Sequence, residues 1–510
     1  MIEMEGTDPV GTIARREGGT EPDYRRIGRR HLQFALAMGA WGGLDALLLR
    51  TALIAPELLP ARTYDALFTT HGVTMLFLFA LPAIWGFAYA VVPAAVGADR
   101  LAFARAGRLA LRLLPAAALG IRAGAIGRLL GLEVAPVATG WTFYPPLSTR
   151  MSNPAVDLAL VGLLAVVAST VLTAGCLLAT VRRRRTVRWL DLDLFTWSVL
   201  TAAAMAVLSF PVLAAAAVFL LSDRLLATGF FAGSTGSPLL WQHLFWFFAH
   251  PLVYVLVLPP MGIVSHVVAR FSGRQLVGRR TAIYATLAIG VLSFTVWGHH
   301  MFATGMDPRA RIAFMYVTLA VALPSSIKAF GWLATLWRGT VRLTAPMETS
   351  IAAIGFFTVG GVTGVALAAV PLGAIYNGTH YVVAHFHFML AGFVGLAVLA
   401  GAYYWFPLLT GRWYDPRLAA LHLRLTAVGI AVAFAALLAL GLAGLPRRAA
   451  TYPAAYAPLH QLATVGAALV AVGQLLFVWN LLRSARSGPP APVDPWAADG
   501  GPRRTTTESP

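Results

Sequence analysis

Charged residues and cysteine are both scarce in this chain of 510 residues. Only 12% of the residues are charged, whereas a soluble protein needs about 25% to cover its surface. Because 58% of the residues are hydrophobic, the shortage predicts that most of the surface faces lipid. The one cysteine, Cys176, excludes a disulfide framework and a cysteine-rich metal cluster within the chain.

Twelve apolar runs are long enough to cross a bilayer, which takes about 20 residues. Arg112, Arg122 and Arg128 interrupt the third run. We predict an all-α integral membrane protein, with a bundle of about 12 transmembrane helices at 31–484 and polar tails at 1–30 and 485–510. The runs lie at 31–55, 66–97, 109–132, 154–181, 192–222, 238–269, 282–306, 310–337, 348–371, 376–408, 418–444 and 459–483.

The excess of basic residues fits a membrane topology rather than a nucleic-acid partner. The formal net charge is +18, but the arginines stand in short groups between apolar runs. With a cytoplasmic N-terminus, sixteen arginines fall in inner loops and seven in outer loops, as in most membrane proteins. Both termini are therefore predicted to be cytoplasmic. Arg447 and Arg448 lie on the outer side against this trend.

Six of the histidines within the predicted spans are candidate functional residues, because an ionisable side chain is costly there. At about 1.5 Å of rise per residue, all six fall in the outer half of the membrane, on four helices. A single histidine in a span is more often a hydrogen-bonded packing residue, but six at one depth indicate several metal sites. They are His71, His250, His299, His300, His385 and His387.

The spacing of these histidines suggests two kinds of site. His385 and His387 are two residues apart, so their side chains point about 200° apart on a helix. One helix could then hold a metal on each side, with His71 as the opposite axial ligand at one of them.

A second kind of site involves neighbouring histidines. His299 and His300, joined by His250, could form a three-imidazole site of the kind that copper accepts. Tyr254 follows His250 by four residues, so both side chains share one face of a helix.

Lysine is almost absent: among 39 basic residues only Lys328 is a lysine, and it lies in the middle of a span. Arginine stays protonated in proteins, whereas a buried lysine can lose its proton. The position therefore suggests proton transfer on the cytoplasmic side of the histidines, although a lysine there by chance, extending toward the inner surface, is the alternative.

With these residues in place, the sequence resembles the haem–copper oxidase family, specifically subunit I of the cytochrome c oxidases, from about residue 33 to 482. Six long segments carry the resemblance in the family's order. They are GWTFYPPL at 140–147, LDLFTWSVLTA at 192–202, WQHLFWFFAHPLVYVLVLPPMGIVSH at 241–266, VWGHHMFATGMD at 296–307, YVVAHFHFML at 381–390 and GLPRRAATYPAAY at 444–456.

The resemblance implies a respiratory terminal oxidase that reduces O₂ to water. The bundle would enclose two haems, of the haem A type, and one copper, CuB. It would sit in a bacterial-type plasma membrane beside a subunit II, whose dinuclear copper centre passes electrons from cytochrome c, and a subunit III. The chain has no cysteine pair for that dinuclear centre.

Roles for individual positions also follow from the resemblance. The metal ligands would be His71 and His387 on the low-spin haem, His385 on the high-spin haem, and His250, His299 and His300 on CuB. Tyr254 would be the redox-active tyrosine, bonded to His250. Arg447, Arg448 and Trp141 would lie at the haem propionates, and Arg50 would lie near the low-spin haem. Lys328, Ser325 and Ser265 would form a proton path to Tyr254.

The sequence departs from the family where protons and a non-redox magnesium are handled. Leu252 replaces the glutamate of the motif HPEVY, and Phe248–Ala249 lack the Tyr–Ser pair that substitutes for it elsewhere. The motif FGNW reads FAYA at 87–90, and a His–Asp pair has become Asn377–Gly378. We therefore expect no glutamate-dependent channel and proton entry through Lys328 alone.

Three other interpretations remain open at this stage. A nitric oxide reductase would hold a non-haem iron with acidic ligands and would lack the tyrosine. A transporter with twelve spans would fit the composition but would not explain six histidines at one depth. A divergent paralogue could bind the cofactors and yet oxidise poorly.

Overall fold

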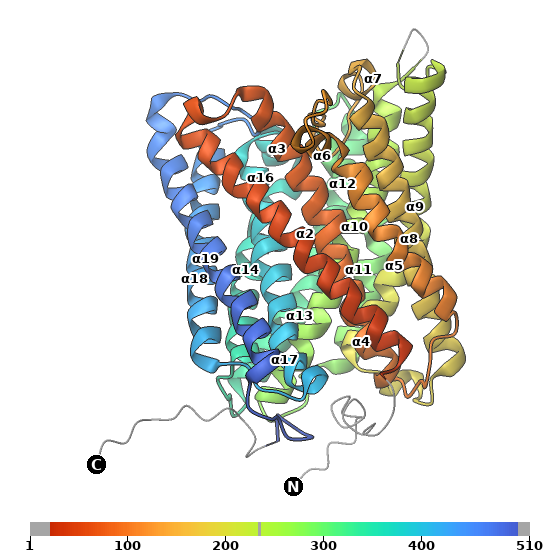
Figure 1. The fold of residues 1–510 in the computed structure, drawn as a ribbon, viewed down its shortest axis with the longest axis vertical. Coiled ribbons are helices and arrows are strands. Elements are labelled where there is room, and N and C mark those ends of the chain that lie inside the picture. The colour runs from red at the N-terminus through yellow and green to blue at the C-terminus, as the bar shows by residue number, and fades with distance from the viewer. Residues whose placement is uncertain (1–20, 233–235, 498–510) are drawn as a thin grey trace.

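The computed structural model describes residues 21–232 and 236–497, which form one helical bundle with no β-strand in these ranges (Figure 1). Most of the two predicted tails, 1–20 and 498–510, lies outside the described residues. The helices of the first half are α2 (Asp23–Ile54), α3 (Ala61–Val73), η2 (Thr74–Ala80), α4 (Leu81–Ala95), α5 (Ala104–Ile121), α6 (Ala123–Leu129), α7 (Leu147–Arg150), α8 (Pro154–Arg184), α9 (Leu194–Leu226) and α10 (Pro238–Phe271).

The second half of the chain continues the bundle. Its helices are α11 (Arg279–Leu292), η4 (Trp297–Met301), α12 (Pro308–Ala320), α13 (Ala322–Trp337), α14 (Ala345–Ala368), α15 (Val370–Tyr376), α16 (His380–His387), η5 (Phe388–Gly395), α17 (Leu396–Thr410), α18 (Pro416–Leu442) and α19 (Ala457–Ser487). The start of α2 and the end of α19 lie at the same end of the bundle (Figure 1). Helix α2 begins at Asp23, earlier than the predicted residue 31, because the basic stretch that contains Arg25, Arg26, Arg29 and Arg30 is also helical.

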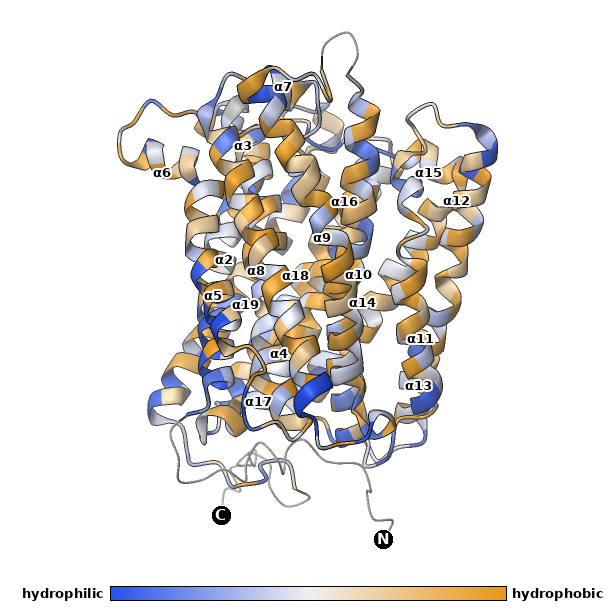
Figure 2. Ribbon diagram, turned by 90° about the vertical axis from the view of Figure 1, so that its right-hand side faces the viewer, coloured by the Kyte–Doolittle hydropathy of each residue, from blue (hydrophilic) through white to orange (hydrophobic). Residues whose placement is uncertain are grey.

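The all-α membrane fold is confirmed, with small differences in the spans. Ten helical segments of the described chain are long and apolar enough to cross a membrane, or eleven if α5 and α6, which bend by 65°, count as one. Hydrophobic residues run along the helices and hydrophilic ones gather toward the two ends (Figure 2). The predicted run at 282–306 differs most, because α11 ends at Leu292 and a 3₁₀ turn, η4, follows.

Small residues let neighbouring helices approach closely. A Cβ added to Gly429 on α18 would lie 2.6 Å from the carbonyl oxygen of Gly466 on α19. On α5 and α8, a Cβ on Gly120 would lie 2.6 Å from the Leu158 oxygen, and one on Gly162 would lie 2.7 Å from the Ala117 oxygen. Close backbone approach at small residues is the usual means by which membrane helices associate.

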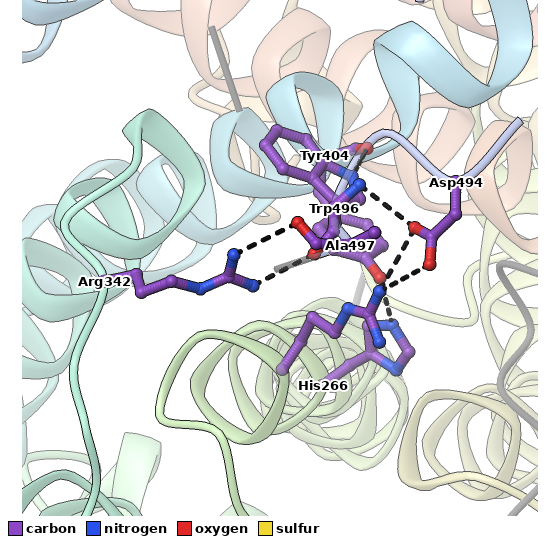
Figure 3. Close-up of polar contacts among 7 residues, drawn as sticks. His266, Arg342, Tyr404, Asp494, Trp496 and Ala497 are labelled. Atoms are coloured by element: carbon purple, nitrogen blue, oxygen red, sulfur yellow. Dashed lines mark hydrogen bonds and ion pairs between the residues drawn. The ribbon is translucent and has the colours of Figure 1, made fainter. Parts of the chain in front are cut away.

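Residues 488–497 follow α19 at one end of the bundle (Figure 1), and Figure 3 shows Trp496 and Ala497 close to Arg342. Asp494 forms an ion pair with Arg270 at the end of α10, with an N–O distance of 2.9 Å. Arg342 donates to the carbonyl oxygens of Trp496 at 3.0 Å and Ala497 at 3.4 Å. This segment therefore joins α10 to the loop that precedes α14.

The Trp496→Ala variant should lower the thermal stability of the detergent-solubilised protein. The indole is 1% exposed, packs against Phe271, Tyr404 and Trp413, and donates from Nε1 to the Tyr404 carbonyl at 3.0 Å. Removing a buried aromatic ring costs about 3–5 kcal/mol. Trp496→Phe, which loses mainly the hydrogen bond, should cost about 0.5–1.5 kcal/mol. An unchanged unfolding temperature for Trp496→Ala would refute this role.

Candidate metal centres

Three histidines from two elements meet in the interior of the bundle. His250 lies on α10, and His299 and His300 lie on η4. Their potential ligand nitrogens all lie within 4.8 Å of one another, and His250 Nδ1 is 3.1 Å from His300 Nε2. Adjacent residues of an α-helix point about 100° apart, so the irregular turn after Leu292 explains how both η4 imidazoles reach one site.

The surroundings leave these imidazoles free to bind a metal. The Thr318 hydroxyl donates to the Phe314 carbonyl at 2.5 Å, so its oxygen accepts from His299 Nδ1 at 3.0 Å. His300 stacks on Trp246 with ring centroids 3.9 Å apart. A neighbour that fixes one ring nitrogen leaves the other as the ligand, as is usual for metal-binding histidines.

Tyr254 lies beside this trio, as the four-residue spacing predicted. Its ring centroid is 4.9 Å from that of His250. The second ring nitrogen of His250, Nε2, is buried and has no hydrogen-bond partner. An unpaired buried nitrogen is costly, so this imidazole is suited to bind a partner such as a metal ion.

A second pair of imidazoles faces each other across the bundle. The rings of His71, on α3, and His387, on α16, are nearly parallel, with an interplanar angle of 11° and centroids 6.4 Å apart. His71 donates from Nδ1 to the Gly42 carbonyl at 2.9 Å, and His387 donates from Nδ1 to the Val383 carbonyl at 2.8 Å. Both Nε2 atoms remain for a metal ion between the rings, since metal–imidazole bonds measure about 2 Å.

His385 is held in the same way on another side of α16. Its Nδ1 donates to the Gly360 carbonyl at 3.0 Å and lies 3.1 Å from the Thr363 hydroxyl. A Cβ on Gly364 would lie 2.7 Å from the imidazole, so glycine is needed there for the ring to fit. π-Helical turns, which are frequent at functional sites, follow these ligands at η2 and η5.

All six histidines line one cavity of about 2240 Å³, together with Tyr254. Sites for a single small ligand measure about 300–1,000 Å³, so this cavity has room for more than one large group. The nitrogen donor sets suit copper at the trio and haem iron at the other histidines. The residues present therefore fit the two haems and the copper that the resemblance implies.

Arg447 and Arg448 lie in the loop after α18 and line the same cavity. Burial and, to a smaller extent, the neighbouring charge of Arg448 lower the pKa of Arg447 to about 10. Among the described residues, no carboxylate forms an ion pair with either guanidinium. Two half-buried cations of this kind suit the carboxylates of haem propionates.

Two other predicted residues line the same cavity. Trp141 lines it, and a Cβ on Gly72, next to His71, would lie 3.2 Å from the Trp141 Cβ. Arg50 also lines the cavity and donates from Nη2 to the His460 carbonyl at 2.6 Å. Arg50 thus ties α2 to α19.

The proposed proton-path residues are less closely grouped. Lys328 is 1% exposed and donates from Nζ to the Thr286 hydroxyl on α11 at 2.6 Å. Ser325 lines the cavity, but Ser265 accepts from Trp332 Nε1 at 2.8 Å and lies outside it. In the described part of the chain, no hydrogen bond joins Lys328 to either serine or to Tyr254.

Sequence reasoning missed the groups that orient the functional side chains. Neither Thr286, the partner of Lys328, nor Thr318, which accepts from His299, belongs to a recognisable sequence motif. The Gly42 carbonyl could not be found at all, because a backbone acceptor leaves no trace in residue identity.

Fold and site together define a class: a multi-span membrane protein whose interior holds a facing pair of imidazoles and a cluster of three histidines, as metal-binding membrane proteins do. The family "Cytochrome C and Quinol oxidase polypeptide I" matches residues 26–469. The chain therefore belongs to this family, and the resemblance is confirmed. As a member, it is the catalytic subunit of a haem–copper terminal oxidase, an oxidoreductase.

Relatives and a solved structure agree with this assignment. Cytochrome c oxidase polypeptide 1 of Halobacterium salinarum is 46% identical over 482 residues, covering 94% of this chain and 81% of the relative. Cytochrome c oxidase subunit 1 of Thermostichus vulcanus is 37% identical over 480 residues, covering 93% and 86%. A haem–copper terminal oxidase dimer solved by cryo-EM shares the fold, with a TM-score of 0.73 at 22% identity over 92% of this chain and 85% of that one.

Proposed function

We propose that this chain reduces O₂ to water with electrons that cytochrome c delivers through a subunit II carrying a dinuclear copper centre, and with protons from the cytoplasm. The observation that carries the proposal is the trio of His250, His299 and His300 beside the half-buried phenol of Tyr254. We further propose that the transmembrane domain spans 31–484, that a subunit III is present, and that both termini face the cytoplasm of a bacterial-type cell.

The cofactors of the proposal are two haems of the haem A type and one copper. When bound, they supply the site where O₂ binds and electrons for its reduction. Their holders would be His71 and His387 for the low-spin haem, His385 for the high-spin haem, His250, His299 and His300 for the copper, and Arg447, Arg448, Trp141 and Arg50 for the haem edges.

The chain itself would provide protons and keep water out. The phenol of Tyr254 lines the cavity beside the trio, so its Oη can release a proton there. Lys328 holds a proton at Nζ against Thr286, and Ser325, one turn earlier on α13, lines the cavity. Proton transfer would then require the Lys328 side chain or water to connect Thr286 with Ser325.

A nitric oxide reductase would need acidic ligands beside the third metal. The trio contains three histidines and no carboxylate within ligand distance among the described residues. Tyr254, which that class lacks, is present. The site therefore supports oxygen reduction better.

The proposal is tested on the purified complex by spectra and gas consumption. Reduced-minus-oxidised spectra should show two haems, and carbon monoxide should shift only one of them, because one haem would be held by His385 alone and the other by both His71 and His387. O₂ uptake with reduced cytochrome c should be rapid and nitric oxide uptake slow. Absence of a haem band, or faster consumption of nitric oxide than of O₂, would refute the proposal. Intact haem bands without O₂ uptake would indicate the inactive paralogue.

A further inference from the structure

A buried ion pair lies inside the bundle, formed by two residues to which the site gives no role. Asp45, in the middle of α2, accepts from Arg122 at the α5–α6 bend, with Oδ2 and Nη1 2.7 Å apart. Their side chains are 6% and 1% exposed. Each buried ion costs several kcal/mol to desolvate, and charged residues within membrane spans are functional candidates by default.

This pair adjoins the segment that orients His71. The Gly42 carbonyl, one turn before Asp45, accepts the His71 Nδ1 hydrogen bond. The Arg122 guanidinium lies 4.3 Å above the ring of Trp41, the residue before Gly42. Asp45, Arg122 and Trp41 therefore surround the peptide that fixes this imidazole.

The two charges are not placed alike around His71. Asp45 lies on α2 one turn after Gly42, whose carbonyl accepts from His71, whereas Arg122 approaches this turn from the α5–α6 bend and contacts Trp41. The carboxylate therefore places a negative charge on the helix that holds His71. Inside a protein such a charge acts over a longer range than in water, because the dielectric constant is low and salt does not screen it.

We propose that the Asp45–Arg122 pair lowers the reduction potential of the haem held by His71 and His387, by fixing a negative charge beside His71. The inference rests on the proposed function, because it requires that haem. An oxidised iron carries one more positive charge than a reduced one, so a nearby carboxylate favours the oxidised form. Arg122 keeps the carboxylate ionised, since a buried carboxylate without a partner would be neutralised by a proton.

A purely structural role for the pair makes a different prediction. The pair also joins α2 to the bend between α5 and α6, so its loss could reduce stability alone. A change in reduction potential separates the two roles, because a structural link between helices would leave the potential of an intact haem unchanged.

The test is a spectroscopic redox titration of the purified complex carrying Asp45→Asn, which keeps the size of the side chain and removes its charge. The reduction potential of the low-spin haem should rise by about 59 mV, which corresponds to a tenfold change in the equilibrium constant of its one-electron reduction. Asp45→Glu, which retains the charge, should stay near the wild-type potential. Asp157→Asn is the matched control, because Asp157 forms an ion pair with Arg224, 2.5 Å apart, between α8 and α9, and it should not shift the potential.

The double variant Asp45→Asn/Arg122→Gln keeps the test decisive if the single variant does not assemble. Its potential should exceed that of the wild type, because Asp45 lies on the helix that holds His71, whereas Arg122 comes from the α5–α6 bend. A wild-type potential in Asp45→Asn or in the double variant would overturn the inference, and so would an equal shift in Asp157→Asn. A wild-type protein without a low-spin haem band would refute the proposed function instead.

Discussion

His299→Ala should remove copper from the protein and abolish oxygen reduction, while both haems remain. The imidazole is one of three within ligand distance of one another, and two imidazoles hold copper far less well than three. We expect less than a tenth of the copper at this site and O₂ uptake lower by about 1,000-fold, which is roughly 4 kcal/mol of transition-state stabilisation. Copper analysis, haem spectra and an oxygen electrode measure the three quantities.

A matched control is available for this substitution. His31 is also buried, at 1% exposure, and has an unpaired Nε2, but it donates from Nδ1 to Ile27 within its own helix, away from the trio. His31→Ala should retain copper and turnover. If His299→Ala kept a full complement of copper, the trio would not be its site.

Lys328→Met should reduce steady-state turnover by about 100-fold or more, in the range that positioned proton donors contribute. The effect should be large because buried apolar side chains occupy the positions where the family has the acid of the other proton route: Leu252 is 1% exposed and Phe248 is fully buried. Phe248 packs against Phe77 and Phe210, with ring centroids 6.2 and 5.0 Å apart. O₂ uptake by the enzyme in lipid vesicles, with reduced cytochrome c, measures the change.

Two further substitutions show whether proton transfer is the cause. Lys328→Arg should be almost as slow as Lys328→Met, because arginine does not release its proton. Thr286→Val, which removes only the hydrogen-bond partner of Lys328, should slow turnover less. Near-normal turnover in Lys328→Met would show that protons enter elsewhere.

The sequence predicted the fold and the grouping of the metal ligands because both depend on long-range regularities. Apolar runs fix the spans, and positions within spans fix the depth, so His71, His250 and His385 could be placed at one level without coordinates. The boundary between α11 and η4 could not be predicted, since the run at 282–306 contains no proline and no Asp, Glu, Lys or Arg that would mark the end of the helix at Leu292.

Polar contacts between helices could not be predicted from the sequence for a different reason. Arg122 was recognised as an interruption of the third run, but its partner Asp45 lies on another helix. Neither spacing nor hydropathy relates two such positions. The same holds for Lys328 and Thr286, whose contact depends on how α13 packs against α11.

Anomalous X-ray scattering from crystals of the purified complex tests the central claim most directly, because it identifies each metal at its position. The account predicts a copper signal among His250, His299 and His300, and iron signals between His71 and His387 and beside His385. An iron signal among the three histidines, or no metal there in an enzyme that consumes O₂, would contradict it.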